Sequence, residues 1–276
     1  MIESPFVILN GFDRSGTSAI SRTLSNHDQI ELLMQPFNSS FIRKRMYEAF
    51  GNVKGKDMEE AIFFFEGLKN NHINNNLIKS EWYFKYSTTQ EYVPGKIHII
   101  KTTINHFAQK WMKENFPDIH VWGIWRDPKE IVSSIIRNNF YGNWYNEALE
   151  LLKPTIETVD FLKENYLHLI ASLNTDIKRT AFLIAVRTHF FLYYLDQDKL
   201  IDYAIFKKDA KMSLKSFCDF YNLKNIDFNE YSKKDLNIIG DPYIGQEEFM
   251  ISSEEEEFIN LVFKKINLLK KEKFTL

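Results

Sequence analysis

The sequence contains very little cysteine: Cys218 is the single thiol in 276 residues. One thiol excludes an internal disulfide and cannot build a zinc site by itself, which suits a reducing compartment. We therefore expect Cys218 to be a small buried apolar side chain and the protein to be cytoplasmic.

The sequence also lacks an excess of charge of either sign. Lysine and arginine number 35, aspartate and glutamate number 37, and the formal net charge is −2. Such a balance creates no overall field that would hold nucleic acid or an anionic membrane. We expect no nucleic-acid partner, and any bound anion must be held by a local group of cations.

Long apolar runs are absent as well. The start, "MIESPFVILNG", has acidic Glu3 and only a short apolar stretch, unlike a secretion signal. The most apolar segment, 181–195, contains Arg187 and His189, and it is shorter than the ~20 residues needed to span a bilayer. We expect this segment to be a core helix and the chain to have no transmembrane segment. No repeat or linker divides the sequence, so one domain over residues 1–276 is predicted.

Apolar runs bounded by turn residues alternate with segments of helical periodicity. The predicted strands are 6–10, 97–100, 119–125 and 201–206. The predicted helices are 15–26, 105–115, 128–138, 178–197 and 212–221, followed by a C-terminal helix over 252–273 with a Ser253–Glu256 capping box. This alternation predicts an α/β fold with a central parallel sheet covered on both faces.

The stretch "FVILNGFDRSGTSAI", residues 6–20, has the strand, turn and helix order of a phosphate-binding loop. Gly11 and Gly16 have the spacing of that loop, but Thr17 stands where its lysine belongs. Glycines permit close backbone approach, and N–H groups at a helix start bind an oxyanion. Arg14 lies within the loop and supplies a cation. Taken alone, the stretch could equally be a plain strand-turn-helix corner.

A second corner of this kind follows in "IHVWGIWRDPKEIVSSIIRNNF", residues 119–140. Arg126 ends the strand, and Ser134 lies on the helix that Pro128 begins. A guanidinium and a hydroxyl that converge there suit a terminal phosphate. The alternative is an Arg126–Asp127 surface pair. Two such corners in one chain favour the phosphate interpretation.

The pair "RSGTS" and "WRDPKEIVSSIIR" resembles the 5′-phosphosulfate loop and the 3′-phosphate motif of sulfotransferases that use 3′-phosphoadenosine 5′-phosphosulfate. The resemblance implies a three-layer fold related to that of the P-loop nucleoside triphosphatases. The loop is more similar to the carbohydrate and protein-tyrosine branches than to the cytosolic branch. The resemblance also implies that the 5′-phosphosulfate is held by Arg14, Ser15, Gly16, Thr17 and Ser18. It likewise implies that Arg126 and Ser134 hold the 3′-phosphate. Residues 203–223 match a later family motif more weakly, with Asp209 as the acidic position.

The implied reaction moves a sulfuryl group to an acceptor hydroxyl of a carbohydrate or small metabolite, releases 3′-phosphoadenosine 5′-phosphate and requires no metal. A nucleotide-binding protein that has lost catalysis is a second interpretation. A phosphate-loop kinase is a third, disfavoured because Thr17 replaces the lysine and no strand ends in the aspartate expected of a magnesium partner.

The sequence leaves the general base open. Thr103 in "KTT" stands where the cytosolic branch has its catalytic histidine, although Lys101 of that motif is retained. Gln35 stands where the protein-tyrosine branch has a glutamate, and an amide cannot take a proton. Asp13 and His106 remain the two candidates, followed by Glu31 and His27. Arg187 is expected either to pair with a buried acid or to point into the cleft, with the cleft preferred.

Overall fold

The computed structural model describes residues 6–36, 56–75, 78, 81–103, 106–137, 143–224 and 251–274. Within these residues a sheet of five strands has the order β2-β3-β1-β4-β5, and every neighbouring pair is parallel. The strands are β1 (Phe6–Gly11), β2 (Ile30–Met34), β3 (Ile97–Thr102), β4 (His120–Trp125) and β5 (Leu200–Asp202). The predicted α/β class with a central parallel sheet is confirmed.

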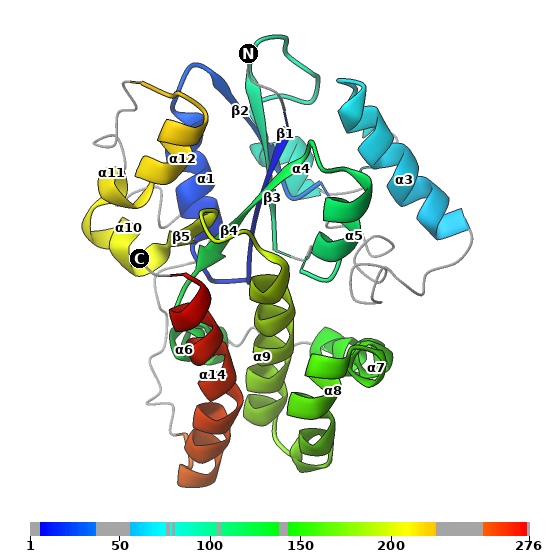
Figure 1. Cartoon of the computed structure of the whole chain (residues 1–276), viewed down its shortest axis with the longest axis vertical. Helices are drawn as coiled ribbons and strands as arrows, with labels where there is room; N and C mark the ends of the chain where they lie inside the picture. The colour runs from blue at the N-terminus through cyan, green and yellow to red at the C-terminus, as the bar shows by residue number, and fades with distance from the viewer. Residues whose placement is uncertain are drawn as a thin grey trace.

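Helices cover both faces of the sheet and the edge where its strands end (Figure 1). One face carries α1 (Thr17–Ser25), α10 (Tyr203–Lys208), α11 (Ala210–Ser213) and α12 (Lys215–Phe220). The other face carries α3 (Lys56–Lys69), α4 (Glu81–Tyr86) and α5 (Gln109–Asn115). Below the strand ends lie α6 (Pro128–Arg137), α7 (Asn143–Thr158), α8 (Asp160–Tyr166), η2 (Leu167–Ser172), α9 (Asp176–Tyr194) and α14 (Ser253–Lys273).

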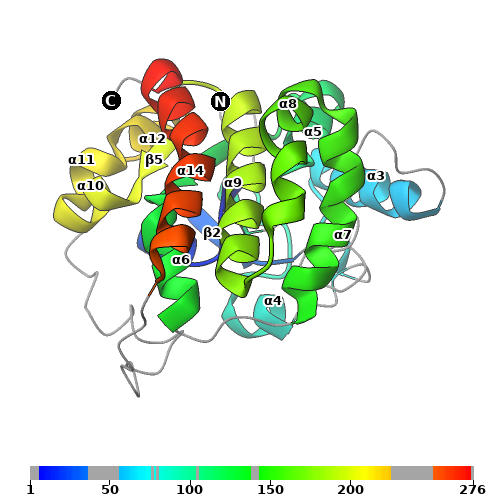
Figure 2. The ribbon, with the colours of Figure 1, turned by 90° about the horizontal axis from the view of Figure 1, so that it is seen from below.

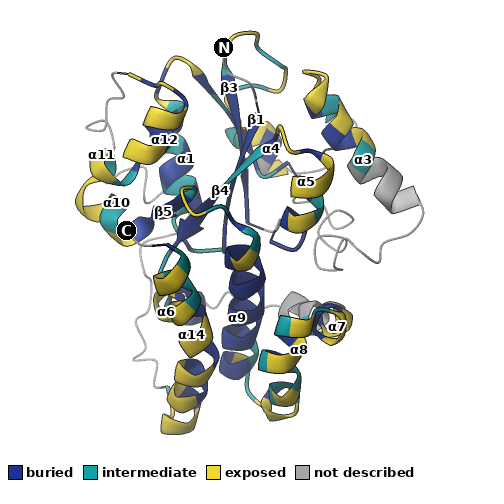
Figure 3. Cartoon of the chain, in the orientation of Figure 1, coloured by how far each residue is buried: buried dark blue, intermediate teal, exposed yellow. Residues whose placement is uncertain are grey.

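The central strand β1 explains why the sheet has helices on both sides. All six of its residues are buried, and the first four alternate between two apolar clusters. Val7 and Leu9 pack with α1, whereas Phe6 and Ile8 pack with α3 and α5. Figure 3 shows the strands as the buried centre of the molecule. A continuous apolar run therefore encodes a strand covered on two faces rather than one.

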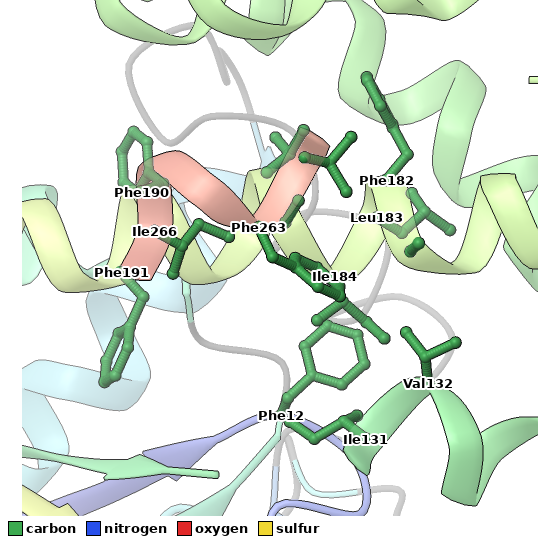
Figure 4. Close-up of a cluster of buried hydrophobic side chains, with 14 of the residues drawn as sticks. Phe12, Ile131, Val132, Phe182, Leu183, Ile184, Phe190, Phe191, Phe263 and Ile266 are labelled. Atoms are coloured by element: carbon green, nitrogen blue, oxygen red, sulfur yellow. The ribbon is translucent and has the colours of Figure 1, made fainter. Parts of the chain in front are cut away.

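Helix α9 confirms the predicted core helix, and most of its side chains are buried. From below, α14, α9, α8 and α7 lie in a row (Figure 2). Phe12, which follows β1, meets Ile184 of α9 and Phe263 of α14 in one apolar cluster (Figure 4). This packing joins the loop after β1 to the helical layer. Among the described helices, α9 included, none has the length and apolarity to cross a membrane.

Two predicted elements have different bounds in the structure, and one strand was missed. The strand predicted over 201–206 stops at Asp202, because the Asp202 carboxylate accepts from the Ala204 and Ile205 N–H groups at 2.8 and 3.4 Å and so begins α10. The helix predicted over 212–221 is divided into α11 and α12 around Leu214. Strand β2 was not predicted.

The capping box of α14 is formed by Ser252 and Glu255, one residue before the predicted Ser253 and Glu256. Ser252 has extended backbone, and its hydroxyl accepts from the Glu255 N–H at 3.3 Å, while Ser253 is already helical. Cys218 is buried as expected, and burial raises the pKa of its thiol to about 11.

Candidate functional site

The loop between β1 and α1 forms the centre of the candidate site, at the carboxyl ends of the parallel strands, where ligands of such folds bind. Two residues in this loop have left-handed backbone, Arg14 with φ of 67° and Gly16 with φ of 94°. Gly16 is the N-cap of α1, and no side chain caps this helix. The first N–H groups of α1 therefore lack the usual side-chain acceptor, as an anion site at a helix start requires.

Both loop glycines are required by close packing. A Cβ on Gly16 would lie 2.2 Å from the Tyr203 ring, and a Cβ on Gly11 would lie 2.6 Å from the Ser15 hydroxyl. Any larger residue would push the loop away from the sheet. The Ser15 hydroxyl is buried and has no hydrogen-bond partner among the described residues. An unsatisfied buried hydroxyl is costly, so this group fits a site completed by a ligand.

The second predicted corner reaches the first through Arg14. One terminal nitrogen of Arg126 donates to the Arg14 carbonyl at 2.7 Å, and Nε of Arg14 donates to the Ser134 hydroxyl at 3.2 Å. The guanidinium of Arg126 thus supports the left-handed backbone of Arg14, while Ser134 orients the Arg14 side chain. The two corners form one site with Arg14 at their junction.

The guanidinium of Arg126 lies in a group of charges at the edge of this site. Its Nε donates to the Glu130 carboxylate at 3.0 Å, and its Cζ atom lies 5.5 Å from the centre of the Tyr203 ring. Lys207 approaches the same carboxylate at 3.7 Å and the same ring at 5.4 Å. Asp127 accepts instead from the Lys129 N–H at 2.8 Å. An Arg126–Asp127 pair, the alternative from the sequence, is therefore not what Arg126 forms.

Lys101 is the next-to-last residue of strand β3 and lies between Leu9 of β1 and Met34 of β2, and its side chain is buried. Burial lowers the pKa of Lys101 to about 8, the negative charge of Asp13 raises it, and the positive charge of Arg22 lowers it. Asp13 itself is only partly buried. Lys101 and Asp13 are thus electrostatically coupled beside the loop.

His106 and Arg187 lie together behind the loop rather than in an open cleft. Each is 1% exposed, and one terminal nitrogen of Arg187 is 3.0 Å from Nδ1 of His106. The same nitrogen donates to the Thr103 carbonyl, and Cζ of Arg187 lies 4.1 Å from the centre of the Phe12 ring. Burial and then the charge of Arg187 lower the pKa of His106 well below its ordinary value.

The two secondary base candidates are engaged elsewhere. The Glu31 carboxylate binds Lys96 at 2.7 Å and Thr88 at 2.6 Å. Burial raises the pKa of Glu31, but these two contacts outweigh it and the net change is downward. His27 uses both ring nitrogens, at 2.8 Å from the Lys224 carbonyl and 3.1 Å from the Gln29 N–H.

Two residues near the site, Glu130 and Tyr203, were not singled out from the sequence, whereas Gln35 was. Glu130 lies four positions after Arg126, a spacing that is itself a signal for a helical ion pair. Tyr203 packs under Gly16 from a distant segment, and no local pattern indicates that contact. Gln35 donates its backbone N–H to the Lys101 carbonyl at 2.8 Å from a left-handed conformation, φ 50°.

Comparison with known proteins gives one result. A family model described as "Sulfotransferase family" matches residues 5–182, which is more than half of the chain. No curated protein matches the sequence. The matched span contains both corners that meet at Arg14.

Proposed function

The chain belongs to the sulfotransferase family, and on this basis we propose that it transfers a sulfuryl group from 3′-phosphoadenosine 5′-phosphosulfate to a hydroxyl of a carbohydrate or small metabolite. The observation that carries the proposal is the junction at Arg14, whose carbonyl accepts from Arg126 and whose side chain donates to Ser134. This junction brings the two expected anion sites within one nucleotide's reach. One domain over residues 1–276 and a cytoplasmic location stay predictions.

The described residues fit the nucleotide donor. The glycine-lined loop and the uncapped start of α1 suit its 5′ end, and the buried Ser15 hydroxyl provides a group for it to bind. Thr17 and Ser18 are the first two residues of α1. For the 3′-phosphate we propose Arg126, which has N–H groups beyond those that bind Glu130 and Arg14, together with Ser134.

The donor supplies an activated sulfuryl group, whose bond to the bridging phosphate oxygen breaks as the acceptor oxygen bonds to sulfur. Arg14 and Lys101 would stabilise the negative charge that grows on the leaving phosphate, a fixed electrostatic contribution that needs no metal. Asp13 would accept the proton of the acceptor hydroxyl. Two observations favour Asp13 over His106: Asp13 is partly exposed in the loop, whereas His106 is buried and its Nδ1 is held by Arg187.

The first test is binding of the product nucleotide. We expect 3′-phosphoadenosine 5′-phosphate to bind about 10- to 100-fold more tightly than AMP, because the added phosphate gains charged hydrogen bonds worth about 1.5–3 kcal/mol. Calorimetry in EDTA measures both affinities without metal. Equal affinity for the two nucleotides would contradict the proposed 3′-phosphate site.

The second test separates the two ends of the nucleotide. Arg126→Ala should weaken binding of 3′-phosphoadenosine 5′-phosphate by about 1.5–3 kcal/mol and change AMP binding less. Arg137→Ala is the matched control, because Arg137 is an exposed arginine at the end of α6 whose Nε donates to the Ser133 carbonyl at 3.2 Å. Calorimetry on both variants decides the point. Full affinity in the Arg126 variant would mean that Arg126 only supports the loop.

The third test uses the lowered pKa of Lys101, about 8 in the free protein. Above pH 8 the free amine is mostly neutral, but a bound anion favours the ammonium and raises its pKa. Nucleotide binding at pH 8.5 should therefore take up a proton, and binding near pH 6.5 should not. Calorimetry in two buffers of different ionisation enthalpy measures the uptake. Lys101→Met should abolish it, and Lys96→Met should leave it unchanged; uptake that survives Lys101→Met rules out Lys101 as its source.

The acceptor requires a direct screen. Labelled donor offered with sugars, polyols, phenols and peptides should be consumed with one class of hydroxyl compound. Nucleotide binding without transfer to any acceptor would favour the interpretation as a binding protein that has lost catalysis. Magnesium-dependent turnover of ATP would favour the kinase interpretation instead.

A further inference from the structure

Arg187 is the charged side chain within the apolar segment 181–195 of the sequence, and it lies near the middle of α9. Its neighbours on the helix, Val186 and Phe190, belong to the apolar cluster below the sheet. Removing a guanidinium from water costs several kcal/mol unless it is well hydrogen-bonded. Leucine or methionine would fill this position at lower cost, so the contacts of Arg187 must explain its presence.

Those contacts join three segments. One terminal nitrogen of Arg187 donates to the Thr103 carbonyl after β3 and also lies 3.0 Å from Nδ1 of His106, before α5. The guanidinium stacks on Phe12 at 4.1 Å from the ring centre. Phe12 immediately precedes Asp13 in the nucleotide loop. Arg187 therefore holds the end of β3 and the start of the loop against α9.

The contact with His106 also determines a proton position. A guanidinium donates hydrogen bonds and cannot accept them, so Nδ1 of His106 must be the acceptor and carries no proton. In a neutral imidazole the proton then resides on Nε2. We infer that Arg187 is a positioning residue that fixes His106 as the neutral Nε2–H tautomer and holds Phe12 at the base of the nucleotide loop.

The rest of the His106 environment supports a neutral ring. Phe12 lies 5.8 Å from it and Phe191 lies 5.3 Å from it, centre to centre, so apolar rings of the loop and of α9 pack against it. Arg187 is the charged group that faces it from α9, and both burial and this charge lower its pKa. Protonation would place two positive charges 3.0 Å apart in a buried site.

A consequence for catalysis rests on the proposed function. With Nδ1 held by Arg187, the remaining nitrogen of His106 carries a proton and can only donate. His106 in this tautomer therefore does not serve as the base, which leaves Asp13 for proton removal. The tautomer itself is a property of the free protein and does not depend on which reaction is catalysed.

Nitrogen-15 NMR of the histidine rings in the full chain without ligand tests the inference directly. His106→Gln assigns the His106 signals among the seven histidines. We expect Nδ1 to be unprotonated and Nε2 protonated, with no second protonation near pH 6.5, the ordinary pKa of histidine. A His106 that carries its proton on Nδ1, or that becomes doubly protonated near pH 6.5, would overturn the inference without affecting the proposed function.

Variants of Arg187 test the cause. In Arg187→Met the His106 proton should no longer be restricted to Nε2, and the pKa of His106 should rise. In Arg187→Lys the side chain still only donates hydrogen bonds, so the Nε2–H form should be retained. His189 on the same helix is the internal control, because its Nδ1 is 2.9 Å from the Tyr166 hydroxyl and should not respond. An unchanged His106 in folded Arg187→Met would show that another group fixes the ring. If Arg187→Met does not fold, the spectra of the wild type and of Arg187→Lys still test whether His106 is held in the Nε2–H form.

An activity measurement completes the test. Glutamine retains a donor where His106 has Nε2–H, so His106→Gln should lower kcat by less than about tenfold, whereas loss of a general base costs about 10²–10⁴. If His106→Gln instead lowers kcat by about 10²–10⁴ and removes the acidic limb of the pH–rate profile, His106 is the base.

Discussion

Replacing Arg14 by alanine is expected to lower kcat by about 10²–10³, the effect of removing a comparable fixed donor to a developing anion. The Arg14 side chain stands at the junction of the two corners, oriented by Ser134 at 3.2 Å and carried on a backbone that Arg126 holds at 2.7 Å. Because charge on the bridging oxygen grows as the bond to sulfur breaks, the contribution of Arg14 should be largest in the transition state. Donor affinity should therefore change less than kcat.

Two companion variants make this result interpretable. Arg14→Lys should recover part of the rate, since it keeps the charge but loses the guanidinium contact with Ser134. Arg179→Ala is the matched control, because Arg179 lies at the start of α9 and pairs with Asp176 at 3.1 Å. Steady-state kinetics with one acceptor compare all three. An unchanged kcat in Arg14→Ala would show that the loop binds the donor without assisting transfer.

Asp13→Asn should lower kcat by about 10²–10⁴, the range for loss of a general base. Nucleotide binding should be unchanged or tighter, because the variant removes a negative charge beside a bound anion. This combination of slower turnover and retained binding distinguishes a base from a residue that only supports the loop.

The coupling of Asp13 to Lys101 gives a second readout of the same variant. The carboxylate of Asp13 raises the pKa of Lys101 in the free protein, so Asp13→Asn should move proton uptake on nucleotide binding to a lower pH. Glu31→Gln is the control, because Glu31 is bound to Lys96 and Thr88. Retention of wild-type kcat in Asp13→Asn would exclude Asp13 as the base.

The sequence by itself determined the fold class and the position of the glycine-containing loop after β1. Apolar runs such as "FVILN" and the 3.6-residue periodicity of 178–197 are local patterns, and each corresponds to a strand or helix of the structure. The spacing of Gly11 and Gly16 is equally local, and both glycines prove to be required by packing. Where two local signals competed, the predicted position was wrong by a few residues. This occurred at Asp202, where a helix cap ends the predicted strand, and at the capping box of Ser252.

Only the tertiary structure decided which side chains meet. Arg14 and Ser134 are 120 positions apart, Arg126 lies 112 positions from the carbonyl it binds, and Arg187 lies 81 positions from His106. Local periodicity states which face of an element is buried but not which distant element covers it. The strand order, with β1 between β3 and β4, brings these segments to one edge of the sheet. Arg187 shows the physical reason. One charge in an apolar helix is compatible with burial and with the cleft that the sequence favoured, and only the packing of α9 on Phe12 supplies its partners.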